Sequence, residues 1–302
     1  MRKIKSFLKQ FYWIRFFHLY LRQLYLKIFY SSTKAKEKYI KRKFKEKLGY
    51  EIDFNREPET FNQKIQFRKL YDNNPLYSIC ADKYRVREYV KEKIGEEYLI
   101  PLYLVTDKLT EEQWDKLPNS FVAKANHDSG TVKIIKDKNK VDKRKIIREI
   151  NMSLKFDYGI ISLEEYYSNI PRKIIVEEYL KEEIIDYKFL CFNGKVEMLF
   201  LCLNRNSTGL NVDFYSKEWE KLPFERHYKN SDKIINKPDN YEKMIEISEK
   251  LAEDFDFVRV DLYEVNNKIY FGKLTFCPGS GMEEFKPEEW DYKIGSYWEK
   301  IN

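Results

Sequence analysis

The chain has 302 residues, of which 43% are hydrophobic and 17% aromatic, enough to bury one large core or several subdomains around a cleft. Lys and Arg number 56 against 49 Asp and Glu, but residues 1–48 hold 15 basic and only 2 acidic side chains. The remainder is therefore net negative, which disfavours general nucleic-acid binding, and we expect no nucleic-acid partner. Three scattered histidines and four cysteines without a CxxC pair argue against common zinc and redox motifs.

The first 48 residues have the composition of a basic, aromatic arm. Residues 4–30 contain no Gly or Pro and place bulky apolar side chains mostly at helical spacing, with cations between them. This pattern predicts an amphipathic helix at an anionic membrane surface, and the alternative is a helix packed on its own body or on a partner. The basic stretch that follows is expected to end as a helix at Gly49. Charges within the apolar run argue against a secretory signal or a spanning helix, so we expect a cytoplasmic protein, peripheral at the inner face of the membrane.

Beyond the arm, the sequence alternates helical patterns with β-branched and aromatic runs. Two short turns, FNG at 192–194 and VNN at 265–267, each join two strand-like runs, as hairpin turns do. Hairpins mixed with helices favour an α+β fold over a doubly wound parallel sheet. Helices are predicted at 61–71, at 81–95, where the helix closes at Gly95, and at 142–155 and 239–253. Strands are predicted at 98–105, 120–126, 131–136, 173–179, 187–193, 196–203, 256–264 and 268–276.

Two segments in the middle of the chain carry side chains suited to nucleotide chemistry. In FVAKANHDSGTVKIIKD, residues 121–137, Lys124 ends a strand before a small polar loop, where Ser129 and backbone N–H groups could cap phosphate oxygens. In IIVEEYL, a buried strand ends in Glu177 and Glu178, which could accept from the amine of a purine. An ordinary β-hairpin and a water-facing acid pair are the alternatives.

A third segment, FVRVDLYEVNNKIYFGKLTFCPGSG, lies near the end of the chain. Alternation along a strand puts Arg259 and Asp261 on one face, and across the hairpin Lys273 and Thr275 share a face that can lie opposite them. Arginine beside a metal-binding aspartate would suit phosphoryl transfer, where catalysis is mostly positioning and charge neutralisation. A solvated hairpin is the competing interpretation.

In chain order, these segments together with ADKYRVREYV and DYKFLCFNGK are similar to the TupA-like branch of the ATP-grasp family, named for a teichuronopeptide biosynthesis protein. The resemblance runs from Phe61 to Tyr297. It implies two α+β subdomains that clamp ATP with Mg²⁺, and a ligase that converts a carboxylate to an acyl phosphate for attack by an amine. The implied partners are an acidic sugar or polysaccharide intermediate and an amine, in the biosynthesis of bacterial capsule or another surface polysaccharide.

The same resemblance implies a division of the chain. Residues 49–302 would form the ATP-grasp domain, preceded by the arm of residues 1–48. Within that domain the predicted parts are an N-terminal helical and α/β part at 49–119, an ATP-lid subdomain at 120–180 and a C-terminal catalytic subdomain at 181–302.

Roles for single residues also follow from the resemblance. Lys83 and Lys124 would hold the ATP phosphates, the loop from Asn126 to Gly130 would cover them, and Glu177 to Leu180 would form the adenine hinge. The full predicted nucleotide-binding set is Lys83, Lys124, Asn126, Ser129, Gly130, Glu177, Glu178, Tyr179, Leu180 and Asp186, the last at the ribose. The predicted catalytic residues are Arg259, which would stabilise the transferring phosphoryl group, Lys188 and Lys273, and the predicted metal ligands are Asp261 and Thr275.

Lys273 departs from the pattern of the family, which has a glutamate bridging two magnesium ions in GELTF where this chain reads GKLTF. An ammonium there would repel divalent cations. Glu264 is not expected to compensate, because alternation places it on the face opposite Asp261, and Thr275 is a weaker ligand than the asparagine often found there. The open explanations are a metal-poor site in which Lys273 contacts the phosphates, a nucleotide binder without ligase activity, or a laboratory substitution.

Four functions therefore stay open from the sequence. The leading one is the carboxylate–amine ligase, and a kinase that phosphorylates a hydroxyl would use the same ATP site. A non-catalytic nucleotide- or sugar-binding component of a polysaccharide assembly is supported by Lys273. A sugar-transferring enzyme rests on the glycosyltransferase label that some members of the branch carry.

Overall fold

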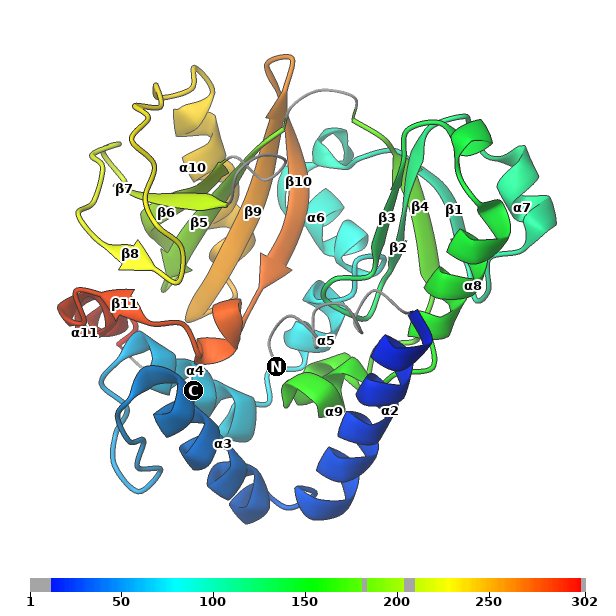
Figure 1. The fold of residues 1–302 in the computed structure, drawn as a ribbon. Coiled ribbons are helices and arrows are strands. Elements are labelled where there is room, and N and C mark those ends of the chain that lie inside the picture. Colours follow the sequence, from blue (N-terminus) through cyan, green and yellow to red (C-terminus); the bar gives the residue numbers. More distant parts are fainter. Residues whose placement is uncertain (1–11, 181–183, 204–209, 300–302) are drawn as a thin grey trace. The chain divides into compact units, whose positions relative to one another are not determined.

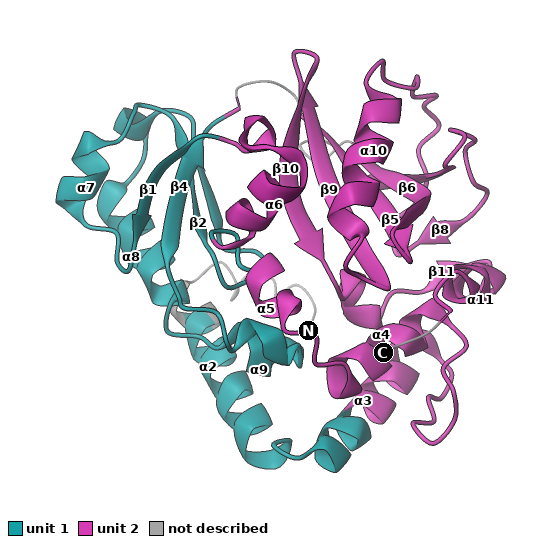
Figure 2. Ribbon diagram, turned by 180° about the vertical axis from the view of Figure 1, so that it is seen from behind, with its two compact units in different colours: residues 1–39, 82–84, 101–179 teal, residues 40–81, 85–100, 180–302 magenta. Residues whose placement is uncertain are grey.

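A computed structural model of the protein describes residues 12–180, 184–203 and 210–299 (Figure 1). Its contacts divide the chain into two compact units, coloured separately in Figure 2. The predicted arm of residues 1–48 is shared between them, with the boundary after Tyr39. Unit 1 comprises residues 1–39, 82–84 and 101–179, and unit 2 comprises residues 40–81, 85–100 and 180–302.

Unit 1 is built on a four-stranded antiparallel sheet with the order β1–β4–β2–β3. Two helices that begin at side-chain caps, Thr110 for α7 and Asp142 for α8, pack on it and bury a core that includes Trp114 and Phe121, whose ring centroids lie 4.9 Å apart. The bounds are β1 (Leu102–Thr106), β2 (Phe121–Ala125), β3 (Val132–Ile135), β4 (Ile174–Glu178), α7 (Glu111–Lys116), α8 (Lys143–Ser153) and α9 (Tyr158–Ser162).

The helical prediction for the N-terminal segment is confirmed over α2 (Tyr12–Phe29), while residues 4–11 of that prediction lie outside the described residues. One side of α2 lies along α9, where Arg22 donates to the Ile161 carbonyl at 3.0 Å. A second helix, α3 (Thr33–Leu48), ends before Gly49, as predicted, because the backbone there takes a positive φ of 85°. Among the described helices, none combines the length and the apolar character that crossing a bilayer requires.

Unit 2 contains a five-stranded antiparallel sheet with the order β10–β9–β5–β6–β7. Helix α10 covers one face, where the ring centroids of Phe189 and Tyr241 lie 6.2 Å apart. Both predicted hairpin turns are confirmed, and residues with positive φ occupy each turn. The strands are β5 (Ile185–Phe192), β6 (Lys195–Leu203), β7 (Asn211–Ser216), β9 (Phe257–Val265) and β10 (Lys268–Thr275), with a small second sheet of β8 (Glu225–Arg226) and β11 (Phe285–Lys286), and the helices are α4 (Phe61–Tyr71), α5 (Leu76–Cys80), α6 (Val86–Ile94), α10 (Tyr241–Ala252) and α11 (Glu289–Ser296).

Two predicted elements are wrong at their boundaries. The strand expected at 98–105 begins only at Leu102, because Glu96–Tyr98 forms a turn of 3₁₀ helix. The helix expected to run through Lys83 begins only at Val86, because the Asp82 carboxylate accepts from the Tyr84 N–H at 2.8 Å and holds the chain in a turn. Elements that the sequence did not indicate are α5, α7, α9, α11, β7, β8 and β11.

Gly295 in α11 provides a test of the packing in unit 2. A Cβ at this position would meet the Glu59 carbonyl and lie 2.8 Å from the Phe61 nitrogen, both rigid backbone groups. We expect Gly295→Ala to lower the free energy of unfolding by about 1–3 kcal/mol through overpacking. The neighbouring exposed Ser296→Ala is the control and should change it by less than about 0.5 kcal/mol. Chemical denaturation of both variants measures the difference, and equal stabilities would contradict the close approach.

Candidate functional site

One face of the sheet in unit 2 carries a row of charged side chains. Apolar residues of β5 and β9 lie on the face that α10 covers. Because side chains alternate along a strand, the polar residues between them lie on the other face, namely Asp186, Lys188, Arg259 and Asp261. The register places Lys188 directly opposite Asp261. The face shared by Arg259 and Asp261 is confirmed.

A β-bulge completes this row from the neighbouring strand. The pairing of β10 with β9 shifts by one residue at Gly272, so that Lys273 lies opposite Asp261 and Thr275 lies opposite Arg259. Gly272 is required there, because a Cβ would lie 2.9 Å from the Asp261 carbonyl oxygen. Lys188, Asp261 and Lys273 therefore form a cross-strand row, which we call the charged row.

Asp261 is the centre of the charged row and is fully buried. Its Oδ1 accepts from Arg259 Nε at 2.6 Å, and its Oδ2 accepts from Arg259 Nη2 at 2.8 Å and from Lys188 Nζ at 2.6 Å. Lys273 Nζ lies 3.8 Å from the same Oδ2. Burial alone would raise the pKa of Asp261, but the charges of the three cations hold it well below its usual range.

The remaining predicted residues of unit 2 surround this centre. Lys188 Nζ also donates to Asp186 at 2.7 Å, so its ammonium lies between two carboxylates and is almost fully buried. Thr275 Oγ1 accepts from Arg259 Nη2 at 3.1 Å. The structure thus gathers all six residues predicted around the phosphoryl group and the ribose, namely Asp186, Lys188, Arg259, Asp261, Lys273 and Thr275. Their roles toward a ligand stay predictions.

Lys273 is the cation of this group that reaches solvent, with a side chain 43% exposed. Partial burial, together with the positive charges of Arg259 and Lys188, lowers the pKa of its amine to about 8, although Asp261 opposes the shift. At pH 8 about half of this amine would be neutral and nucleophilic, against less than about 1% for an ordinary lysine with a pKa near 10.4.

We therefore expect trace acetylation at pH 8 to label Lys273 before other lysines, with a rate that rises from pH 7 to 9 and then levels off. Peptide mass spectrometry measures the labelling, and Lys268, exposed on the same strand, is the comparison. A rate for Lys273 that still climbs in parallel with that of Lys268 above pH 9 would contradict the shift.

Magnesium, predicted with Asp261 and Thr275 as ligands, does not fit the charged row and its neighbours. Both oxygens of Asp261 already accept from cations, and the Thr275 hydroxyl accepts from Arg259. Three cations face two carboxylates, whereas a hard divalent cation needs a site rich in negative oxygen ligands. Within residues 12–180, 184–203 and 210–299, no group of three His, Cys, Asp or Glu is arranged to hold a metal. Glu264 does not compensate, since its carboxylate accepts from Asn240 at 3.0 Å.

A second candidate group lies in unit 1, at the loop between β2 and β3. Lys83 Nζ donates to the carbonyl of Ala125 at 2.8 Å and to that of Asp128 at 2.5 Å, and lies 4.0 Å from the Asp128 carboxylate. Burial lowers the pKa of Lys83, and Lys124 lowers it further, whereas Asp128 raises it. The loop carbonyls thus position the Lys83 amine directly beneath the predicted phosphate-covering loop.

Asn126 holds the start of this loop in place. Its Nδ2 donates to Asp82 and to the Pro171 carbonyl, both at 2.8 Å, and its Oδ1 accepts from the Lys173 N–H at 2.7 Å. The side chain is fully buried, so its observed contacts are structural. At the other end, Gly130 takes a φ of 121°, which favours glycine. Contact of Asn126, Ser129 and Gly130 with a nucleotide stays a prediction.

Lys124 and Glu177 form an ion pair between neighbouring strands, with Nζ 2.5 Å from Oε2. The Glu178 N–H donates to the Pro101 carbonyl at 2.9 Å, which continues the sheet, and Tyr179 and Leu180 follow β4. The expected adenine hinge therefore begins on β4 and continues beyond the strand. Its contact with a base stays a prediction.

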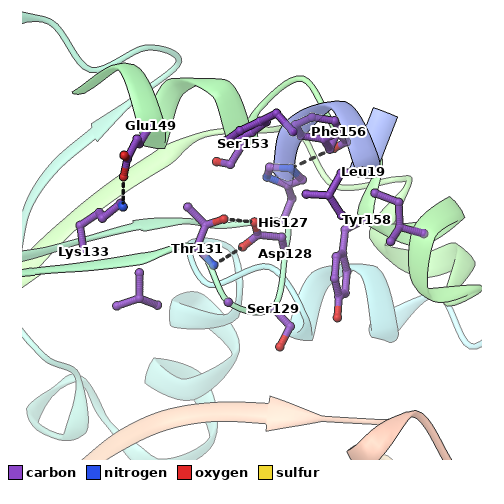
Figure 3. A pocket seen from close by; sticks show the side chains of 14 residues that line it. Leu19, His127, Asp128, Ser129, Thr131, Lys133, Glu149, Ser153, Phe156 and Tyr158 are labelled. Carbon is purple, nitrogen blue, oxygen red and sulfur yellow. Dashed lines mark hydrogen bonds and ion pairs between the residues drawn. The ribbon is translucent and has the colours of Figure 1, made fainter. Parts of the chain in front are cut away.

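A cavity of about 210 Å³ lies beside the loop, bordered by Asp128 and Thr131 on one side and by Tyr158 on the other (Figure 3). His127 also lines it: Nε2 lies 3.2 Å from the Phe156 carbonyl, and Nδ1 has no hydrogen-bond partner among the described residues. Burial lowers the pKa of His127, which favours the neutral ring.

Sequence reasoning assigned no role to Asp82 and Asp128, which organise the loop. Asp82 accepts from Asn126, and Asp128 accepts from the Thr131 N–H at 3.3 Å. Their positions carried a signal, because Asp82 directly precedes the predicted Lys83 and Asp128 lies inside the predicted loop. The candidate residues therefore form two groups, one in each unit.

Comparison with solved structures gives several ligases and a synthetase. The D-alanine–D-alanine ligase from Bacillus anthracis, complexed with ATP, is 19% identical, with 67% of this chain and 55% of that chain covered and a TM-score of 0.40. The L-amino acid ligase from Bacillus licheniformis is 10% identical, with 80% and 56% covered and a TM-score of 0.48. The N5-carboxyaminoimidazole synthetase from Staphylococcus aureus, complexed with ADP, is 12% identical, with 71% and 51% covered and a TM-score of 0.43.

The chain thus spans little more than half the length of these structures, and at this similarity none of them indicates its substrate. No protein of curated function matches the chain. A family model described as TupA-like ATPgrasp matches residues 63–299. Because this match covers most of the chain, including both candidate groups, the protein belongs to the TupA-like ATP-grasp family and has the α+β ATP-grasp fold.

Proposed function

We propose that this protein is an ATP-dependent ligase that joins the carboxylate of an acidic sugar to an amine during the synthesis of a surface polysaccharide. The observation that carries the ligase proposal is the clustering of Lys188, Arg259 and Lys273 on one face of a sheet, in a chain of the ATP-grasp family. Phosphoryl transfer depends mainly on positioning and on neutralising charge, and clustered cations supply both.

In the proposed reaction, a carboxylate oxygen attacks the γ-phosphorus of ATP. The new P–O bond forms as the bond to the β,γ-bridging oxygen breaks, and ADP leaves with that electron pair. The amine nitrogen then attacks the acyl carbon, inorganic phosphate leaves, and the amine proton passes to solvent. Arg259 and Lys273 would stabilise the charge of the transferring phosphoryl group. Lys83 and Lys124 are the residues for which the family resemblance implies phosphate binding.

The substrate class rests on the family resemblance of the ordered motifs, and the charge of the site is compatible with it. A uronic acid supplies the carboxylate that the first step needs, and an exposed cation such as Lys273 could bind it before transfer.

The test is ADP release by the full chain with ATP, a panel of uronates and a panel of amines. We expect ADP release above the ATP-only background, and a product whose mass equals acid plus amine minus water. Lys273→Met should lower the rate, while Lys268→Met, an exposed lysine on the same strand, should not. Phosphate transfer to a hydroxyl would identify a kinase, and UDP release from a nucleotide sugar would identify a sugar transferase; either would overturn the proposal.

A second candidate function is favoured by the poor fit of magnesium. Among its described residues, the chain keeps cationic groups for phosphates but has no cluster of carboxylates for a metal, so it could serve as a nucleotide-binding component without turnover. ATP binding by calorimetry, with no ADP formed from any acid and amine pair, would identify this function in place of the ligase.

A further inference from the structure

The outward side of helix α2 is almost entirely apolar. At 100° per residue, the exposed large apolar side chains span an arc of about 180° around the helix, and the exposed His18 also lies within this arc. A helix at a water interface normally presents polar residues on that side, so this arc is unusual for a surface that faces water. The exposed residues are Ile14, Phe17, Tyr20, Leu21, Leu24, Tyr25, Ile28 and Phe29, each between 40% and 63% exposed, and we call them the outer face of α2.

The opposite side of α2 is fixed to unit 1. Phe16 packs on Phe156 with ring centroids 5.1 Å apart, Leu26 is buried, and Gln23 Oε1 accepts from the Asp157 N–H at 2.7 Å. These contacts determine the rotation of the helix about its axis. The outer face is therefore held away from unit 1 by packing, and turning it inward would break these contacts.

Charge is placed at the edges of the outer face. On the helical wheel, Arg22 lies at one border of the arc and Lys27 at the other, and both are exposed. The helix has no Asp or Glu along its 18 residues. The next helix begins with exposed Lys34 and Lys38. Tyrosines and phenylalanines between flanking cations are the side chains preferred at the boundary of an anionic bilayer.

We propose that the outer face of α2 docks on the surface of an anionic lipid bilayer, with the helix lying in the plane of the interface. The apolar arc would enter the boundary between headgroups and acyl chains, and Lys27 would extend to the lipid phosphates, while Arg22 keeps its contact with the Ile161 carbonyl. A protein partner is less suited to this face, because it would leave the flanking cations without complementary charge unless it were itself acidic. The proposal is independent of the ligase chemistry.

The test uses full-length protein and vesicles of phosphatidylcholine, with or without 30% phosphatidylglycerol. We expect binding to the anionic vesicles, and a decrease of roughly tenfold in the partition coefficient when salt rises from 0.1 to 1 M. The double variant Phe17→Ser with Ile28→Ser should lose at least about tenfold in binding through lost apolar contact. Ile234→Ser, at a side chain 92% exposed in unit 2, is the matched control and should bind like the parent.

Point substitutions are preferable to deletion of residues 1–48, because Leu26, Ile40 and Phe44 are buried and their removal would disturb both units. An unchanged melting temperature of the double variant shows that the fold is intact. Equal binding of parent and double variant, or equal binding to both vesicle types, would overturn the proposal. Concentration-dependent dimerisation without vesicles that the same double variant abolishes would assign this face to a second copy of the chain.

Discussion

Replacing Lys273 by glutamate should make nucleotide binding depend on magnesium. In the parent, three cations and two carboxylates give the cluster around Asp261 a net charge of +1, and the substitution would reverse it to −1. The new carboxylate would stand beside Asp261 across the strand pair, which provides the oxygen-rich environment that magnesium prefers. We expect added magnesium to strengthen ATP binding of K273E by roughly tenfold or more, about 1.4 kcal/mol.

Calorimetric titration with magnesium or with EDTA measures this change. The parent should bind ATP with affinities that differ by less than about threefold between the two conditions, a difference of about 0.6 kcal/mol. Lys273→Met separates the two effects, because it removes the cation without adding a carboxylate, and it should weaken ATP binding in both conditions. A parent that binds ATP only with magnesium would refute the metal-poor interpretation of this site.

Asp261→Asn should be the most destabilising single change in the cluster. The amide would leave Arg259 and Lys188 buried without their shared anion, and breaking a buried ion pair from one side costs about 3–5 kcal/mol. Urea unfolding measures the loss. Glu242→Gln is the control, because that carboxylate is 76% exposed in its pair with Lys237 and its loss should cost less than about 1 kcal/mol. Equal effects of the two substitutions would show that the buried cations find other partners.

The contribution of Asp261 to the free energy of unfolding should also depend on pH, and the lowered pKa of Asp261 in the folded protein determines the direction. Because the pKa of Asp261 in the folded protein lies below that in the unfolded chain, its contribution is fully present above the unfolded value of about 3.9. It decreases as pH falls below that value toward the folded-state pKa. The part of the gap in unfolding free energy between parent and D261N that comes from Asp261 itself should therefore shrink as pH falls below about 4.

Sequence patterns predicted the strands well where hydrophobic runs were long and bounded by turns. Seven of the eight predicted strands are confirmed to within two residues at each end. The two-residue strands β8 and β11 were missed because such short pairings have no periodicity. Alternation also predicted the common face of Arg259 and Asp261, because it depends only on positions within one strand.

Contacts between residues far apart in the sequence could not be predicted from the sequence patterns. Asn126 was expected at a phosphate, yet its amide is engaged by Asp82 and Lys173, which lie 44 and 47 residues away. Lys188 was expected to face a ligand, and its position between two carboxylates depends on the pairing of β5 with β9. Periodicity gives the face of a side chain, whereas its partner is decided by strand order and register.

The bulge at Gly272 means that the number of residues in β10 determines which side chains lie beside Asp261. Because one extra residue separates the two halves of β10, its apolar and charged positions exchange faces at that point. Deleting Gly272 would remove no side chain from the strand. It would nevertheless turn Lys273 and Thr275 away from Asp261, unless the half of β10 nearer the hairpin turn changed faces instead. If a related chain has one residue fewer in this strand, we therefore expect different side chains beside the aspartate, even where the other aligned residues are identical.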